Sequence, residues 1–151
     1  MDVCVRFYGD RLVSLAVFGS VGRGTARSDS DIDLMLVADP LPKGRMPRVR
    51  EFEAGVLAAL GPALDAAARA GVSTRLSPLF KTKAEAVAGS PLFLDMTEDA
   101  RILFDRDSFL AGRLDALRGR MRELGSRRVR RGDMWFWDLK PDFRRGEVIE
   151  L

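Results

Sequence analysis

Residues 12–37 read LVSLAVFGSVGRGTARSDSDIDLMLV, in which two short apolar runs enclose a loop rich in Gly, Ser and Arg. Leu12–Phe18 and most of Asp31–Val37 are continuously apolar, which is typical of strands buried on both faces of a sheet. Gly19 ends the first run, and its missing side chain lets the backbone leave a strand sharply. The stretch therefore predicts two buried strands joined by a polar loop.

The loop carries residue types that bind phosphate. Gly19 is followed by Ser20, so backbone N–H groups and a hydroxyl can approach an anion closely. Arg23 is a candidate phosphate contact or a surface charge, because a guanidinium pairs well with phosphate oxygens but is also common on surfaces. We expect Gly19, Ser20, Arg23 and Ser30 to form a nucleotide-binding loop; the alternative for the glycines is a simple turn.

Asp31 and Asp33 stand two residues apart at the start of the second run. Alternation along a strand places both carboxylates on the same face. Carboxylates beside a phosphate site suit Mg²⁺, which commonly takes one or two of them together with substrate phosphate oxygens. The alternative, a solvated face of an edge strand, fits poorly with the apolar residues that fill the rest of the run. Asp31 and Asp33 are therefore the predicted metal ligands and catalytic residues.

Gly19-Ser20, ten intervening residues and Asp31-Ile32-Asp33, with Ser30 directly before, resemble the signature of the polymerase-beta-like nucleotidyltransferase superfamily. The match is similar to its minimal nucleotidyltransferases, small proteins often encoded beside a helical HEPN-domain protein. The resemblance implies that Gly19 and Ser20 hold the triphosphate of ATP and that the two aspartates hold Mg²⁺. It further implies transfer of a nucleotide, AMP in our interpretation, onto a hydroxyl of a partner protein, with the chain acting as antitoxin to a HEPN-type toxin.

One feature of the family is missing. Active members usually carry a third carboxylate on a later strand, and the matching stretch here, Val72–Phe80, has no Asp or Glu. Glu85 and Asp95 are candidate substitutes. The missing acid leaves open a slow enzyme, substrate-assisted deprotonation, a base from the partner, or a catalytically silent nucleotide-binding regulatory subunit. Small-molecule modification is a further enzymatic variant.

The rest of the chain adds helices and two more strands. We expect an α/β (α+β) nucleotidyltransferase fold, a small mixed sheet covered by helices, with a C-terminal helix and an aromatic arm. Gly61-Pro62 should kink or divide the first long helix, and Pro78 suggests an edge strand. The expected elements are a helix from Pro47 that ends at a left-handed Gly71, a strand Val72–Phe80, a short helix capped by Thr82 and Glu85, another from Ser90-Pro91, a final strand Arg101–Phe104 and a leucine-striped helix Asp107–Leu124.

Composition narrows the chemistry. The chain has 151 residues, no histidine and one cysteine, Cys4, which excludes histidine acid–base catalysis, zinc clusters and an internal disulfide framework. Its 46% apolar and 31% charged residues are typical of a soluble globular protein. We expect a cytoplasmic protein without a membrane segment, because no long apolar run and no leader is evident.

The basic character is C-terminal: residues 111–151 hold 11 Lys/Arg against 7 Asp/Glu. We divide the chain into a nucleotidyltransferase domain, 1–106, and a C-terminal helix with a basic and aromatic arm, 107–151, packed on the same domain or on a partner. Trp135 and Trp137 favour packing on this chain or on a second copy, as in a homo-oligomer, over nucleic-acid stacking. The arginines of the nucleic-acid alternative are Arg127, Arg128, Arg130 and Arg131.

Overall fold

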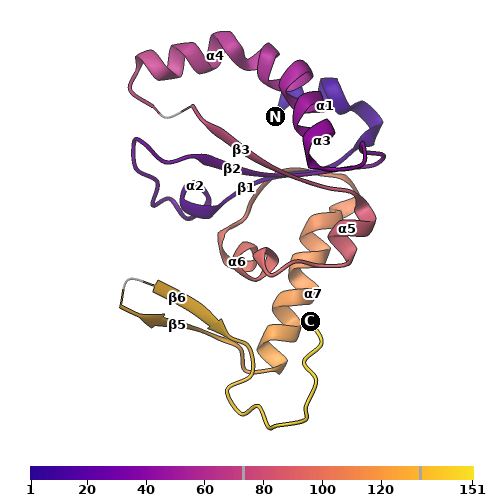
Figure 1. Cartoon of the computed structure of the whole chain (residues 1–151), viewed down its shortest axis with the longest axis vertical. Coiled ribbons are helices and arrows are strands. Elements are labelled where there is room, and N and C mark those ends of the chain that lie inside the picture. Colours follow the sequence, from indigo (N-terminus) through magenta and orange to yellow (C-terminus); the bar gives the residue numbers. More distant parts are fainter. Residues whose placement is uncertain (73, 133) are drawn as a thin grey trace.

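The computed structural model describes residues 1–72, 74–132 and 134–151. A four-stranded mixed sheet of order β3-β2-β1-β4 lies between two groups of helices (Figure 1). The central strand β1 (Leu12–Phe18) pairs antiparallel with β2 (Ile32–Ala38) and with β4 (Arg101–Asp105), while β2 runs parallel to β3 (Leu76–Lys81). The predicted small mixed sheet covered by helices is confirmed.

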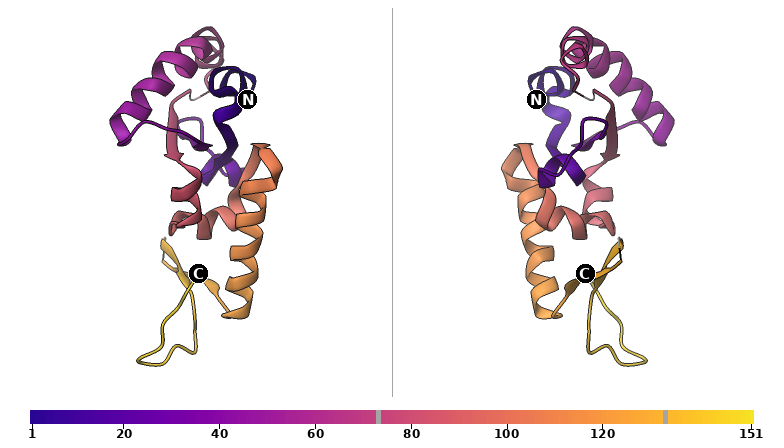
Figure 2. Two further views of the ribbon diagram at one scale, coloured as in Figure 1. Left: turned by 90° about the vertical axis from the view of Figure 1, so that its right-hand side faces the viewer. Right: turned by 90° about the vertical axis from the view of Figure 1, so that its left-hand side faces the viewer.

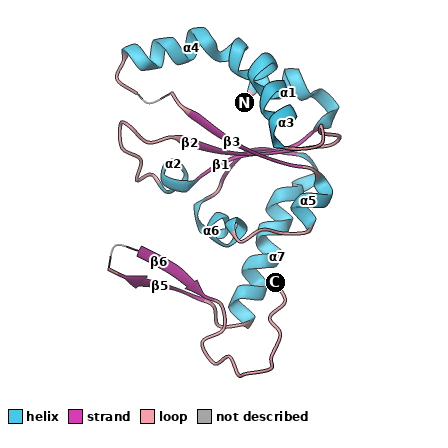
Figure 3. Cartoon of the chain, viewed as in Figure 1, coloured by secondary structure: helices cyan, strands magenta, loops and turns pink. Residues whose placement is uncertain are grey.

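Helices cover both faces of the sheet (Figures 2 and 3). One face carries α1 (Asp2–Tyr8), α3 (Arg45–Phe52), a π-helical turn (Glu53–Leu57) and α4 (Ala58–Arg69). The other face carries α5 (Lys83–Val87), α6 (Leu92–Asp99) and α7 (Phe109–Glu123). The short helix α2 (Gly19–Arg23) follows β1, and 3-10 turns occupy Gly9–Arg11 and Arg106–Ser108. None of the helices in the described ranges is long and apolar enough to cross a membrane.

Two hydrophobic clusters explain the continuous apolar runs. On β2, Leu34 and Leu36 pack under α1 and α3, whereas Met35 and Val37 pack toward α6 and α7. Met35, Leu36 and Val37 are 0% exposed. Burying each such side chain contributes roughly 1.5–3 kcal/mol, so the central strands anchor the loop that joins them.

The long helix is not divided at Gly61-Pro62, which contradicts one of the two outcomes, kink or division, that the sequence predicted. Pro62 lies inside α4. The helical hydrogen-bond pattern changes earlier, at the π-helical turn Glu53–Leu57 that directly precedes α4. A side chain on Gly55 in that turn would come within 1.9 Å of the Phe7 ring, so α1 packs directly on this backbone. Pro62 is tolerated because α4 has no buried residue, which leaves water able to reach the carbonyl that proline cannot bond.

The third strand begins at Leu76, four residues later than the Val72 start that we predicted. Ser73 of the predicted strand lies outside the described residues. The strand is at the edge of the sheet, as Pro78 indicated, and Gly71 has the expected positive φ of 77°. The capping box of Thr82 and Glu85 is also present at the start of α5.

The C-terminal part differs most from the prediction. The leucine-striped helix is confirmed as α7, with Leu110, Leu114 and Met121 buried. The strand β4 is not the final one, because a hairpin of β5 (Arg127–Arg131) and β6 (Met134–Asp138) follows it. Neither hairpin strand has a fully buried residue, so the alternation that reveals a strand beside a core is missing.

Candidate nucleotide site

Gly19 and Asp33 meet at the end of the central strands. Phe18, the last residue of β1, is paired with Asp33 on β2. Gly19 then turns away with a φ of 66°, and a Cβ placed on it would lie 2.4 Å from Asp33 Oδ2. Any side chain at Gly19 would therefore displace this carboxylate, so the structure joins the two halves of the signature in one contact.

The chain after Gly19 forms the short helix α2. It ends at Gly24, which has a left-handed φ of 74°, and Thr25 N–H donates to the Ser20 carbonyl at 2.9 Å. Because Ser20 and Arg23 are three residues apart, they lie on the same face of α2.

Ser30 and Asp31 lie just before β2. The Ser30 hydroxyl accepts a hydrogen bond from Arg27 N–H at 2.9 Å, so it stabilises the turn that precedes the strand. Asp31 pairs with Arg75, whose side chain is 74% exposed. Asp31 and Arg75 also line a pocket of about 400 Å³ between α3 and β3.

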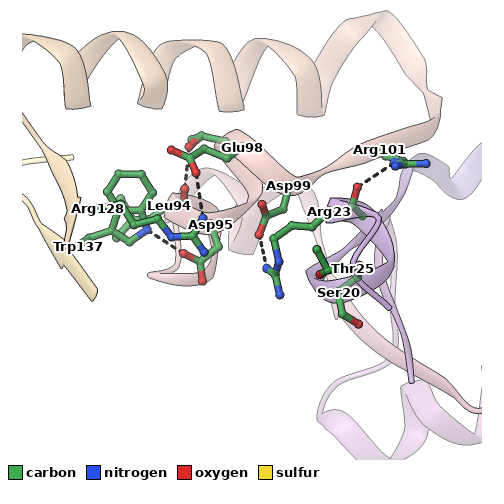
Figure 4. A network of polar contacts seen from close by, with 12 residues as sticks. Ser20, Arg23, Thr25, Leu94, Asp95, Glu98, Asp99, Arg101, Arg128 and Trp137 are labelled. Carbon is green, nitrogen blue, oxygen red and sulfur yellow. Dashed lines mark hydrogen bonds and ion pairs between the residues drawn. The ribbon is translucent and has the colours of Figure 1, made fainter. Parts of the chain in front are cut away.

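Arg23 and Gly22 attach α2 to the end of α6 (Figure 4). Arg23 Nη1 donates to Asp99, whose side chain is only 4% exposed. A Cβ on Gly22 would be 2.2 Å from the Asp99 carbonyl oxygen, and Arg101 Nε donates to the Gly22 carbonyl at 2.8 Å. Sequence analysis missed Asp99 and Arg101, because they lie far along the chain and outside any motif.

The end of α6 also contacts the C-terminal hairpin. Trp137 Nε1 donates to Asp95 at 2.7 Å, and Arg128 Nη1 donates to Glu98 at 3.1 Å. The Arg128 guanidinium lies 3.5 Å from the centre of the Trp135 ring, close enough for a cation–π contact. One stretch of α6 therefore faces the hairpin with Asp95 and Glu98 and faces α2 with its last residue (Figure 4).

The two candidate substitutes for the third carboxylate have other partners. Glu85 accepts two hydrogen bonds from Arg48, at 2.7 and 2.9 Å, and one from Thr82 N–H at 2.9 Å. The Arg48 hydrogen bonds, helped by Thr82, lower the pKa of Glu85 to about 2. Asp95 is bound to Trp137. Ser77 lies beside Asp33 on the neighbouring parallel strand, so the adjacent position holds a hydroxyl instead of an acid.

The described residues contain no group of three or more Asp, Glu, Cys or His side chains placed to hold a metal ion. A larger cavity, of about 460 Å³, is lined by α6, α7 and the C-terminal segment but by no carboxylate side chain of the described chain. A hard cation bound by the predicted acidic pair would take its remaining ligands from substrate oxygens and water.

Comparisons with known proteins define the class. Residues 2–88 match the family of the nucleotidyltransferase domain. The chain is also 32% identical over 120 residues to protein MJ1305 of Methanocaldococcus jannaschii, which is provisionally named a protein adenylyltransferase. That match covers 78% of this chain and 76% of the relative. The chain therefore belongs to the nucleotidyltransferase domain family and is a nucleotidyltransferase, which confirms the resemblance seen in Gly19-Ser20 and Asp31-Ile32-Asp33.

Solved structures with a related shape include a toxin–antitoxin crystal structure with AMP-PNP, at 17% identity and a TM-score of 0.46, covering 80% of this chain and 86% of that one. Another is the tri-AMPylated HEPN toxin in complex with MNT antitoxin of Shewanella oneidensis, at 15% identity and a TM-score of 0.43, covering 80% and 82%. These scores are too low to add to the family assignment, which rests on the two sequence matches.

Proposed function

We propose that this nucleotidyltransferase moves AMP from ATP onto a hydroxyl of a partner protein in a Mg²⁺-dependent reaction. The observation that carries the proposal is the contact of the Gly19 backbone with the Asp33 carboxylate, since it brings the phosphate-binding half of the signature against its acidic half. The name of the relative MJ1305 supports a protein as acceptor. The proposed setting is the cytoplasm, where ATP is available.

The residues present fit a divalent cation that is shared with substrate. Asp31 and Asp33 supply hard oxygen donors. Gly19 has no Cβ that would displace the Asp33 carboxylate. Arg75, which neutralises Asp31 here, is 74% exposed and can move aside at little cost. Bound Mg²⁺ would supply positive charge against the α-phosphate and the departing pyrophosphate.

The chain's own residues would hold and orient the nucleotide. Backbone N–H groups after Gly19 and the Ser20 hydroxyl would bind phosphate oxygens, as in other glycine-serine loops that approach an anion closely. Arg23 would add a guanidinium on the same face of α2. Ser30 would act by holding the turn that presents Asp31, through its hydrogen bond with Arg27.

The proton of the acceptor hydroxyl would pass to a phosphate oxygen of the substrate or to a base of the partner. Ser77 occupies the position beside Asp33 where an acid would be useful, and Glu85 and Asp95 already have partners. A docked partner that positions its own hydroxyl for in-line attack would reduce the need for a base. We propose a tyrosine of a HEPN-type toxin, because added AMP brings bulk and negative charge that can block a catalytic surface.

The contacts made by the hairpin of β5 and β6 favour a protein partner over nucleic acid. Arg127 pairs with Asp138, Arg128 covers the Trp135 ring, and Trp137 is bound to α6. Aromatic faces must be open to stack on bases, and acidic Asp95 and Glu98 nearby oppose a phosphate backbone. The hairpin thus uses Trp135, Trp137, Arg127 and Arg128 for contacts within the protein.

Mass spectrometry of the chain incubated with a HEPN-type partner, ATP and Mg²⁺ tests the proposal. We expect the partner to gain the mass of AMP with the wild type and not with Asp33→Asn. Glu85→Gln is the matched control outside the site and should retain transfer. A stable complex with bound nucleotide but no added mass would instead support the silent regulatory subunit, which the serine at position 77 also favours.

A further inference from the structure

We infer that Asp99 is a positioning residue for nucleotide transfer: it holds Arg23, and with it α2, in the orientation that binds the nucleotide phosphates. The inference rests on the proposed use of the loop at residues 19–31 as the nucleotide site. Asp99 itself would touch no substrate, and it would act only through the guanidinium of Arg23.

Burial shows that Asp99 is committed to this pair. Its side chain is 4% exposed, whereas that of Arg23 is 32% exposed. A carboxylate so deeply buried needs a cation, because an unpaired buried charge is strongly destabilising. Separating Arg23 from Asp99 would therefore destabilise the protein, so the Arg23 side chain keeps a fixed position beside Asp99.

Arg23 has donors to spare for a ligand. A guanidinium carries five N–H donors, and the contact with Asp99 uses Nη1. The Arg23 side chain is 32% exposed, and Arg23 follows Ser20, the residue proposed to bind phosphate, by three positions, so the two residues are neighbours on α2. Asp99 can thus fix the guanidinium of Arg23 (Figure 4) and leave its other N–H groups free to bind an anion.

The backbone of α2 is held by the same segment. Gly22 packs so closely on the Asp99 carbonyl that a Cβ would lie 2.2 Å from it, and Arg101 Nε binds the Gly22 carbonyl at 2.8 Å. Three contacts on two consecutive residues leave α2 little freedom to rotate. Asp99 is therefore well placed to set the direction of Arg23 rather than merely to neutralise it.

The end of α6, which carries Asp99, also forms hydrogen bonds with the hairpin of β5 and β6. Asp95 and Glu98, within one turn of Asp99, bind Trp137 at 2.7 Å and Arg128 at 3.1 Å on the hairpin. Groups held by such supporting contacts keep a defined geometry. The hairpin thus stabilises the end of α6 from which Asp99 reaches Arg23.

Titration calorimetry with Mg-ATP and, separately, with adenosine tests the inference. We expect Asp99→Asn to weaken Mg-ATP binding about tenfold, the loss of one charge-assisted contact, and to leave adenosine binding unchanged. Arg23→Met should have the same selective effect, and the double variant should be no weaker than either single one. Asp115→Asn is the matched control, because Asp115 also pairs with an arginine, Arg118, but at an exposed position on α7, and this variant should bind Mg-ATP as the wild type does.

Other outcomes separate this inference from the proposed function. Wild-type protein that fails to bind Mg-ATP would contradict the nucleotide site and the inference with it. Normal Mg-ATP binding by Asp99→Asn, additive losses in the double variant, or equal losses for adenosine and ATP would overturn the positioning role alone. If Asp99→Asn does not fold, Arg23→Met and Arg23→Lys still test the positioning role. A lysine at position 23 cannot contact Asp99 and a phosphate at the same time, so Arg23→Lys should bind Mg-ATP more weakly than the wild type.

Discussion

Glu85 and Asp33 are two carboxylates of the same domain with opposite surroundings. Glu85 is held by both terminal nitrogens of Arg48 and by the Thr82 N–H. Asp33 lies against the Gly19 backbone, and no ion pair among the described residues includes it. The protein itself satisfies Glu85, whereas Asp33 keeps capacity to bind a ligand; Asp31, the other predicted ligand, is paired with the exposed Arg75.

The largest effect is expected from removing the acids of the site. Asp31→Asn combined with Asp33→Asn should lower Mg-ATP affinity roughly 100-fold, because two charged contacts of about 1.5 kcal/mol or more are lost. The melting temperature should stay the same or rise, since neither change breaks a buried pair. Calorimetry and thermal unfolding measure the two quantities, and Glu85→Gln should show the reverse pattern. Unchanged Mg-ATP affinity would exclude the pair from the site.

A smaller effect is expected from the backbone that faces Asp33. Gly19→Ala places a Cβ 2.4 Å from the Asp33 carboxylate and adds roughly 1–2 kcal/mol for a left-handed residue with a side chain. We expect nucleotide transfer to fall by about tenfold or more in a steady-state assay. Gly61→Ala, where the structure leaves open space, is the control and should be fully active. Equal activities would show that the contact has no role in the reaction.

The smallest effect concerns the structural acid and depends on pH. The pKa of Glu85 is lowered from 4.5 to about 2, so its ionised form stabilises the fold above pH 4.5 and this contribution disappears as the pH falls toward 2. Its side chain is 42% exposed, and we therefore expect only about 1 kcal/mol at pH 7. Urea unfolding of wild type and Glu85→Gln should differ at pH 7 and converge near pH 2. A difference that persists at low pH would mean that packing, not charge, is responsible.

The sequence was most informative where local chemistry and packing agree. The run Leu12–Phe18 forms a strand with the same bounds, because its apolar side chains pack into the hydrophobic clusters on both faces of the sheet. Thr82 and Glu85 predict the start of α5, because the hydrogen bonds of their capping box lie within one helical turn. The hairpin at residues 127–138 was missed, since its arginines and aromatics contact α6 and each other rather than a buried core.

The sequence by itself determined the family, the two central strands and the residues of the signature, because these depend on short-range patterns between positions 12 and 37. Only the tertiary structure decided how those residues are supported. Asp99 meets Arg23 across 76 positions of the chain, and Ser77 rather than an acid lies beside Asp33 in the sheet. Contacts between distant segments follow from how helices and strands pack, and no local pattern encodes which side chains will meet.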